Sequence, residues 1–268
     1  MTTIELAPVS RHRVRWAVSD TLTITARNLI SFTRIPEALF FSTLQPIMFV
    51  LLFRYVFGAA IPIPGGVPYV DYMMPGIFVQ SVMFGAVSTS VGLAEDLQKG
   101  LIERFRALPM ARSAVLAGRT TADGVRNIFV VTIMTGVAAL VGFGFLTGAF
   151  DYILGALILL AFSYAMSWGF AAIGLSAPNS ETAQVMSFPI LIPLTFASTA
   201  FVPITVLPGW LQAFARYQPV SVVINGARSL MVGGYYHSNT YELWALVWIA
   251  GLLVVLVPVG VWRYRQTA

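Results

Sequence analysis

Long apolar stretches alternate with short polar connections along the chain, and six of these stretches have the length of a membrane-spanning helix. A helix needs about twenty mainly apolar residues to cross the hydrocarbon layer of a bilayer. The pattern therefore predicts an all-α membrane protein. Its single membrane domain covers residues 37–262, and its six transmembrane helices cover approximately residues 38–57, 72–94, 128–146, 152–177, 182–204 and 243–262.

Small residues and prolines inside these stretches add detail to the prediction. Prolines within a spanning helix bend it, and neighbouring helices satisfy the backbone groups that the bend frees. We expect such bends at Pro46, Pro189 and Pro193. Small side chains allow two helices to approach closely in a membrane. The second stretch is predicted to make such contacts through Gly85, Ala86, Ser88, Ser90 and Gly92.

The segment before the first apolar stretch mixes apolar with charged side chains. Residues 16–35 have no continuous apolar run, which favours an amphipathic helix lying in the plane of the membrane interface. Arg27 and Arg34 would then point toward lipid head groups, whereas a short cytosolic helix is the alternative. We assign residues 1–36 to a cytoplasmic N-terminus with this interfacial helix, and residues 263–268 to a cytoplasmic tail.

The connection formed by residues 205–242 is not a plain hydrophilic loop. Pro-Gly at 208–209 and Gln-Pro at 218–219 would begin two short amphipathic helices, and Gly-Gly at 233–234 would end the second. These helices either dip into the outer leaflet and return or lie along its surface. Sealing the outer end and handling a substrate are both compatible with this pattern.

Composition and charge support the membrane class and give an orientation. Only 10% of the residues are charged and 57% are hydrophobic, whereas a soluble domain has about 25% charged residues. Thirteen of the sixteen lysines and arginines fall in residues 1–36, 95–127 and 263–268. Positive charge collects on the cytoplasmic side, so both termini are predicted to be cytoplasmic in a bacterial plasma (inner) membrane. The same placement argues for contacts with the inner leaflet and against a nucleic-acid partner.

Several kinds of chemistry have no support in the sequence. There is no cysteine, and the two histidines, His12 and His237, fall on opposite sides of the predicted membrane, so we expect no metal site. The single lysine, Lys99, follows Gln98, so the chain has no Gly-Lys-Ser/Thr ending of a phosphate-binding loop. We therefore predict neither an enzyme nor a cofactor bound by this chain.

Ionisable residues inside the predicted spans are also rare. Ion-coupled transporters need such residues to carry their ions, and here the acidic residues are predicted at span ends or in connections. Arg54 is the exception. Its long side chain is expected to reach the outer interface, with a substrate or partner contact as the alternative.

A charged segment, residues 95–112, separates the second and third apolar stretches. Gly100 would let the second span end and a short transverse helix begin, and Pro109 would stop that helix. Lys99 and Glu103 are spaced as an i, i+4 pair. Steps of four, four and three residues place on one helix face Leu97, Leu101, Phe105 and Leu108. A helix that transmits force from a docked protein and a helix that only fixes the loop would show the same pattern.

Two segments together resemble the membrane subunits of type-2 ABC exporters, especially the daunorubicin-resistance-like permeases, and the resemblance covers nearly the whole chain. The outer segment is similar to the family's re-entrant region through Leu207-Pro208-Gly209-Trp210-Leu211-Gln212, Gln218-Pro219-Val220-Ser221 and Ala227-Arg228. The charged segment is similar to the family's Glu-x-x-Leu-Arg-x-x-Pro coupling helix, although Phe105 stands where leucine is more usual. Its matching residues are Glu95, Gly100, Leu101, Ile102, Glu103, Arg104, Phe105, Arg106, Ala107, Leu108, Pro109 and Arg112.

The resemblance implies a permease subunit of an ATP-driven exporter that moves a hydrophobic drug, antibiotic or lipid-like compound out of the cell. A separate ABC ATPase subunit would hold ATP and magnesium and dock on the coupling helix, and a second identical or related permease subunit would complete the pathway. The first, second and fifth spans would line that pathway. Candidate lining residues, each of which also suits ordinary helix packing, are Gln45, Met48, Gln80, Met83, Met186 and Phe196.

Three alternatives remain open from the sequence. A polysaccharide or glycolipid exporter belongs to the same class and has the same architecture. An ion-coupled transporter without an ATPase would need a buried acidic residue. A membrane scaffold that transports nothing would have no need of the coupling segment.

Overall fold

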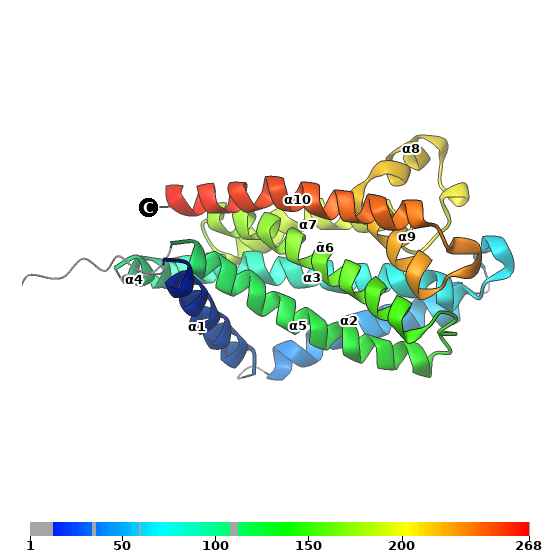
Figure 1. Ribbon diagram of the computed structural model, residues 1–268, viewed down its shortest axis with the longest axis horizontal. Helices are drawn as coiled ribbons and strands as arrows, with labels where there is room; N and C mark the ends of the chain where they lie inside the picture. The colour runs from blue at the N-terminus through cyan, green and yellow to red at the C-terminus, as the bar shows by residue number, and fades with distance from the viewer. Residues whose placement is uncertain (1–12, 34–35, 59, 108–111, 268) are drawn as a thin grey trace, which may run out of the picture.

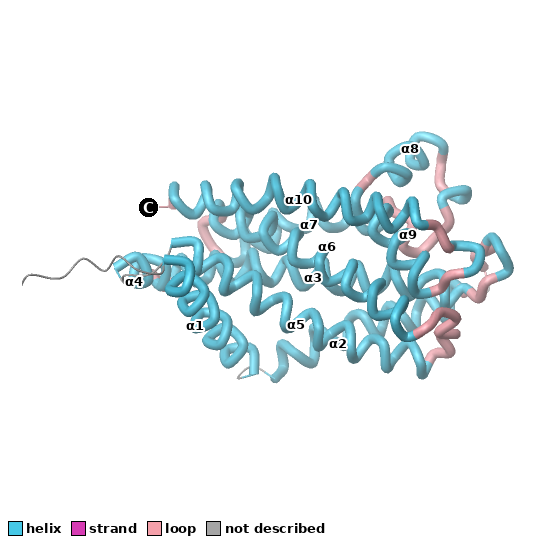
Figure 2. Tube along the Cα trace, viewed as in Figure 1, coloured by secondary structure: helices cyan, strands magenta, loops and turns pink. Residues whose placement is uncertain are grey.

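The computed structural model describes residues 13–33, 36–58, 60–107 and 112–267. The structure is 85% helical and has no strand in those residues. Long helices run side by side along an elongated bundle, and the loops collect at its two ends (Figures 1 and 2). The prediction of an all-α protein is therefore confirmed for the described part of the chain.

Ten α-helices are described, and one of them continues into a π-helical turn. Three short 3₁₀ turns, Pro64–Gly66, Ile204–Val206 and Gly234–Tyr236, lie in the connections. The π-helical turn, Leu52–Phe57, extends α2. The α-helices are α1 (Arg13–Thr33), α2 (Pro36–Leu51), α3 (Tyr69–Gln98), α4 (Leu101–Ala107), α5 (Arg112–Leu140), α6 (Ala149–Ser176), α7 (Ser180–Phe196), α8 (Gly209–Tyr217), α9 (Pro219–Met231) and α10 (Asn239–Gln266).

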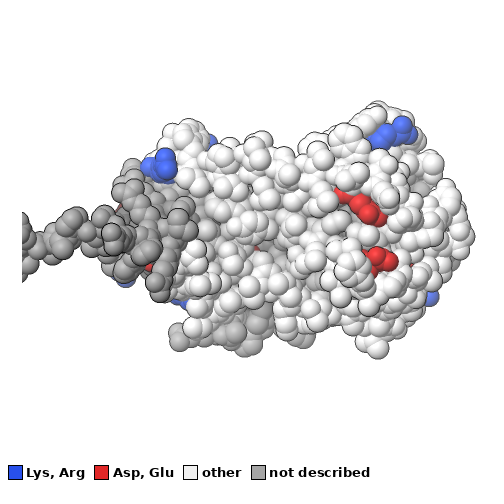
Figure 3. Space-filling model, in the orientation of Figure 1, with Lys and Arg blue, Asp and Glu red and all other residues white. Residues whose placement is uncertain are grey.

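Four of the described helices have the length and apolar composition to cross a membrane, within α3, α5, α6 and α10. The predicted first span corresponds to α2 with its π-helical turn, of which Thr43–Phe57 is the apolar part. The predicted fifth span corresponds to α7, which has 17 residues. These features define a multi-pass membrane protein. Uncharged side chains cover the broad middle of the face seen in Figure 3, as a surface in contact with lipid requires.

The helix α3 forms the centre of the bundle, because most of its side chains are buried against α5, α6, α7 and α9. Close backbone contacts hold it there. A Cβ atom added to Gly174 of α6 would collide with the backbone of Ser90, and one added to Gly76 would collide with the backbone of Ala200. Small residues on α3 thus allow close packing at Ser90, as the sequence predicted.

Two predicted spans have different boundaries in the structure. The third was predicted at 128–146, but α5 begins sixteen residues earlier, at Arg112, and ends at Leu140. Its polar first half is helical because other helices supply partners for its charges. The fifth was predicted to reach residue 204, but α7 ends at Phe196 and the chain continues without regular structure to Pro203. Side chains from α9 satisfy the backbone there.

Arg228 on α9 is the main support of this irregular segment. The side chain is only 1% exposed. Its Nε donates a hydrogen bond to the carbonyl of Tyr72 (3.1 Å), and Nη2 donates to the carbonyl of Thr199 (2.8 Å). Its Nη1 donates to Oδ1 of Asn225 at 2.8 Å, and its guanidinium carbon lies 3.8 Å from the centre of the Tyr72 ring. Arg228 therefore ties α3, α9 and the segment after α7 together.

Two more side chains complete this end of the bundle. Gln218, which separates α8 from α9, donates from Nε2 to the carbonyls of Leu194 (3.0 Å) and Ala197 (3.1 Å). Tyr236 donates to the carbonyl of Pro64 at 3.0 Å. Burial raises the pKa of the Tyr236 phenol to about 12 even though Arg228 opposes the shift. The phenol is therefore a neutral donor at physiological pH.

Replacing Arg228 by Met should lower the thermal unfolding midpoint of the purified protein, because the carbonyls of Tyr72 and Thr199 each lose a buried hydrogen bond from the guanidinium, and the Tyr72 hydroxyl still donates to Thr199. A hydrogen bond to a charged group contributes about 1.5–3 kcal/mol. The matched control is Arg216→Met, which removes an exposed arginine of α8 and should leave the midpoint unchanged. Equal midpoints for the two variants would show that the Arg228 hydrogen bonds do not hold this end together.

Candidate functional site

The junction between α3 and α4 lies where the sequence placed it. Gly100 has φ +65°, in the left-handed region that glycine adopts most easily. The amide of Lys99 donates to the carbonyl of Glu95 (3.0 Å) and the amide of Gly100 to that of Leu97 (2.9 Å), which ends α3. The chain then reverses direction locally and α4 begins at Leu101.

Ile102 attaches α4 to the rest of the bundle. It is 1% exposed, while Glu103 and Arg104 beside it are exposed. Leu97 and Leu101, from the predicted apolar stripe, are only partly buried. The side chains of residues 105–107, and residues 108–111 entirely, lie outside the described part of the chain. Ile102 belongs to a cluster of buried apolar residues from α3, α5, α6 and α10, whose other buried members are Leu93, Val115, Leu116, Trp168, Ala171, Leu175 and Tyr264.

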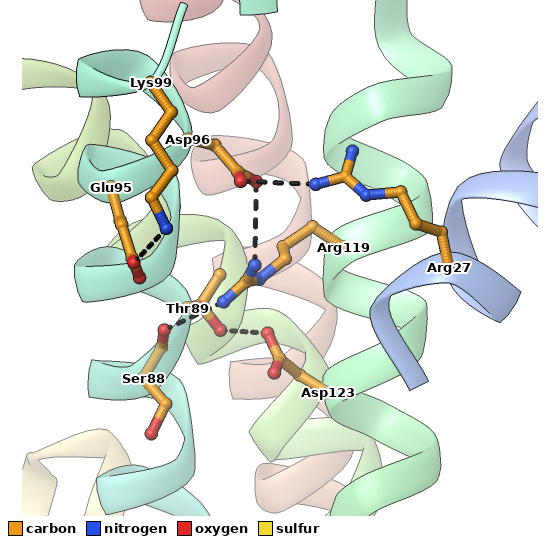
Figure 4. A network of polar contacts seen from close by, with 8 residues as sticks. All are labelled: Arg27, Ser88, Thr89, Glu95, Asp96, Lys99, Arg119 and Asp123. Carbon is orange, nitrogen blue, oxygen red and sulfur yellow. Dashed lines mark hydrogen bonds and ion pairs between the residues drawn. The ribbon is translucent and has the colours of Figure 1, made fainter. Parts of the chain in front are cut away.

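The predicted ion pair between Lys99 and Glu103 is wrong. Lys99 instead donates to Oε1 of Glu95 at 2.5 Å, one turn back on α3 (Figure 4). The break at Gly100 explains the difference, because the i, i+4 geometry exists only within a continuous helix. The hydrogen bond to Glu95 raises the pKa of the Lys99 amine. Both side chains are exposed, so this pair contributes little to stability.

Asp96 joins three helices at the same end of the bundle (Figure 4). One carboxylate oxygen lies 3.3 Å from Nη2 of Arg27 on α1, and the other lies 3.7 Å from Nη1 of Arg119 on α5. Arg27 was predicted to point toward lipid head groups, and this orientation is wrong. A hydrogen bond of 3.1 Å from the Thr25 hydroxyl to the carbonyl of Gly118 also holds α1 against α5.

A second polar cluster lies one turn deeper in α5. Asp123 is fully buried, accepts a hydrogen bond from the Thr89 hydroxyl, and lies 3.9 Å from Arg126 (Figure 4 shows the Thr89 contact). Residues 95–127 were predicted to form a cytoplasmic connection and no acid was expected inside the bundle, which is wrong for Asp123. The 3–4 residue spacing of Arg119, Asp123 and Arg126 was the signal that could have shown a charged helix face.

A cleft of about 800 Å³ lies beside these clusters. Its walls come from α1, α2, α3, α5 and α7, and it extends along α3 from Ser81 to Leu101 at the junction with α4. Arg119 and Arg126 are among its lining residues, as is Gln45 of α2. The structure therefore connects the proposed coupling segment to an open volume between the helices.

The six candidate pathway residues are not gathered at one place. Of these six, Gln45 lines the cleft. Met48 on α2 is exposed, as are Met186 and Phe196 on α7, whereas Gln80 and Met83 are buried in the centre of the bundle. Their role in a pathway stays a prediction.

The outer candidates and Arg54 also have defined places. Pro208 immediately precedes α8, which Gly209 begins, and Pro219 begins α9. Trp210 is largely exposed, in contrast to the buried Arg228. Arg54, in the π-helical turn, donates from Nε to the carbonyl of Val141 at 3.3 Å.

The described residues contain no cluster of histidine and carboxylate side chains that could hold a metal ion. Their architecture is that of an all-helical, multi-pass membrane protein with a polar cleft and a short helix at one end. Comparison with known proteins narrows this class. Residues 19–232 match the family model described as ABC-2 type transporter, so the chain belongs to the ABC-2 type transporter family.

Relatives give the same assignment. The chain is 35% identical to the daunorubicin resistance ABC transporter permease protein DrrB1 of Streptomyces coeruleorubidus, over 93% of this chain and 87% of the relative. It is 27% identical to the probable doxorubicin resistance ABC transporter permease protein DrrC of Mycobacterium tuberculosis, over 99% of this chain and 96% of the relative. The inner membrane transport permease YadH of Escherichia coli is 23% identical over 78% of each chain. The protein is therefore a transport subunit of an ATP-driven ABC exporter.

Replacing Gly100 by Ala should destabilise the protein by about 1–2 kcal/mol, because a side chain disfavours the left-handed conformation of the α3–α4 junction. Gly251→Ala in α10 is the control, since its added methyl group meets no atom within 4 Å and alanine favours a helix. Thermal unfolding in detergent compares the two. A Gly100→Ala protein as stable as the wild type would mean that the junction does not need this conformation.

Proposed function

We propose that the protein is the permease of an exporter that moves a hydrophobic drug, antibiotic or lipid-like compound out of a bacterial cell. The names of the relatives support the drug class, since DrrB1 and DrrC are described as daunorubicin and doxorubicin resistance permeases. A family of this kind implies a partner ATPase subunit, which would bind ATP and magnesium. Two permease subunits, identical or related, would enclose the pathway.

The proposed topology has six spans: α2 with its π-helical turn, α3, α5, α6, α7 and α10. α1 would lie in the inner interface, and α8 and α9 would form the outer re-entrant region. Both chain ends would be cytoplasmic in the plasma membrane. The position of α1, α4 and the end of α10 at one end of the bundle, opposite α8 and α9, supports this topology (Figure 1). The domain limits at residues 37 and 262 belong to the same proposal.

The observation that carries the mechanism is how α4 is attached. Its exposed Glu103 and Arg104 are available to a docked ATPase, while Ile102 belongs to a buried apolar cluster with residues of α3, α5, α6 and α10. Movement of the ATPase would therefore displace α3, α5, α6 and α10 together. Asp96 would carry the displacement to α1 through Arg27. The coupling segment in this proposal extends from Glu95 to Pro109.

The ion-coupled alternative required a buried acidic residue, and Asp123 is one. Its hydrogen bond from Thr89 and its proximity to Arg126 give it a structural role, and the family membership favours ATP as the energy source. The glycolipid alternative differs from the main proposal only in the substrate. Its negatively charged carriers would suit the arginines of the cleft.

Replacing Glu103 by Ala should reduce substrate transport per ATP hydrolysed in the reconstituted complex, because the change alters the surface on which the ATPase docks. Insertion and the thermal unfolding midpoint should stay unchanged, since the side chain is exposed. Glu181→Ala, an exposed acid at the start of α7, is the matched control and should keep the wild-type ratio. Wild-type coupling in Glu103→Ala would contradict the role of α4.

The topology has a direct chemical test because the chain has no cysteine. Single cysteines at Lys99 and Gln212 should react with an impermeant maleimide from opposite sides of the membrane. Lys99 should be labelled only in inside-out vesicles and Gln212 only in intact spheroplasts. Labelling of both cysteines from the same side would contradict the six-span topology.

A further inference from the structure

The cleft between α1, α3 and α5 has an unusual lining for a bundle inside a membrane. Two of its lining side chains, Glu95 and Asp96, are acidic, and four are basic: Arg27, Lys99, Arg119 and Arg126. Glu95 pairs with Lys99, and Asp96 is shared by Arg27 and Arg119. Within the described part of the chain, Arg126 makes no ion pair with either of these carboxylates; its ion pair is with Asp123, which does not line the cleft.

Arg126 has hydrogen-bonding capacity that the protein leaves unused. The residue is 93% buried, yet its Nη2 has no hydrogen-bond partner among the residues that the structure describes. Asp123 lies 3.9 Å away, which is too long for a hydrogen bond, and its other oxygen accepts from Thr89. A buried guanidinium without an acceptor is costly, because its loss of hydration is not offset. Such a group is stable when a ligand supplies the acceptor.

Two glycines of α3 give the arginines their positions. A Cβ atom added to Gly85 would lie 2.5 Å from Nη2 of Arg126, and one added to Gly92 would collide with Nη2 of Arg119. The two glycines are seven residues apart on α3, and the two arginines are seven residues apart on α5. Seven residues of helix rise about 10.5 Å at 1.5 Å per residue. Both guanidinium groups therefore pack against α3 at positions where glycine leaves room for them.

The rest of the lining fits an amphipathic molecule. Phe32 of α1 packs over both arginines, with ring-to-guanidinium distances of 5.9 Å for Arg119 and 5.2 Å for Arg126. Apolar side chains from α3, α5 and α7 continue the wall of the cleft, namely Phe84, Val87, Val91, Val130 and Phe188. A charged group held by the arginines would thus have an apolar surface beside it for a hydrocarbon chain.

We propose that this cleft binds the anionic head group of an amphipathic molecule, a phosphate or a carboxylate, with Arg126 as the principal contact and Arg119 as the second. Guanidinium groups hold such oxygens by paired, charge-assisted hydrogen bonds. If the bound molecule is the substrate of the exporter, the inference rests on the proposed function. A membrane lipid retained in the cleft would satisfy the same chemistry.

The test measures lipid binding to the full-length protein without its ATPase. Protein in nanodiscs made of equal parts phosphatidylglycerol and phosphatidylcholine is released and the bound lipids are counted by native mass spectrometry. Wild-type protein should retain phosphatidylglycerol in preference to phosphatidylcholine. Arg126→Gln should reduce that preference about tenfold, since a hydrogen bond to a charged group is worth roughly one such factor. Arg216→Gln removes an equal charge from exposed α8 and should change nothing.

A second pair of variants covers the case in which Arg126→Gln does not fold. Gly85→Ala should displace the guanidinium and lower the preference, whereas Gly136→Ala in α5, whose added methyl group meets no atom within 4 Å, should not. Arg126→Lys keeps the charge and should retain part of the preference. Equal retention of the two lipids by the wild type, or an unchanged preference in both Arg126→Gln and Gly85→Ala, would overturn the proposal.

Two further arms identify the source of the anion. Displacement of phosphatidylglycerol by millimolar inorganic phosphate would show that the site recognises the head group itself. Displacement by phosphatidic acid alone would show that the hydrocarbon chains contribute to binding. Either result supports the site. Stimulation of ATP hydrolysis in the assembled complex by phosphatidylglycerol, lost in Arg126→Gln, identifies a transported molecule. Binding without stimulation identifies a resident lipid. Failure of lipid binding leaves the Glu103 coupling experiment untouched, so the two proposals fail separately.

Discussion

Charge inside an apolar bundle is the constraint on which this structure depends. A charged side chain away from water is costly unless another group neutralises it. Asp96 meets this requirement with two arginines from different helices, and that arrangement fixes α1 and α5 against α3. The polar half of α5 is helical for the same reason, because α3 offers hydrogen-bond partners to Arg119 and Asp123. The cleft follows from it, since polar side chains keep these helices from forming a uniform apolar contact.

The same end of the bundle also holds α4. Its two attachments differ in kind: Gly100 fixes the direction of the chain, and Ile102 fixes the depth of the helix in the bundle. Because Ile102 belongs to the buried cluster formed with residues of α3, α5, α6 and α10, α4 is anchored in the core and is more than a loop resting on the surface. An external load on α4 is thereby distributed over helices that also form the walls of the cleft or support them.

Local backbone chemistry was predictable from the sequence, and pairing between helices was not. Gly100 and the Gln-Pro step at 218–219 act through their own dihedral angles, so the breaks they produce fall where the sequence placed them. The partners of Lys99 and Arg27 depend on what lies opposite in space, and the predictions for both were wrong. Residues 112–127 appeared to be a connection because their charges were counted without the helices that neutralise them.

The two buried arginines, Arg126 within the bundle and Arg228 at its outer end, show how structure and binding differ. Arg228 is 1% exposed and each of its three nitrogens donates a hydrogen bond within the protein, so it holds the fold together. Arg126 is 7% exposed and lines the cleft, and its buried Nη2 has no hydrogen-bond partner among the described residues. Residue type and burial are nearly the same in the two cases. What separates them is whether the protein itself supplies the acceptors, and this difference makes the cleft around Arg126 a binding site and the outer end a structural one.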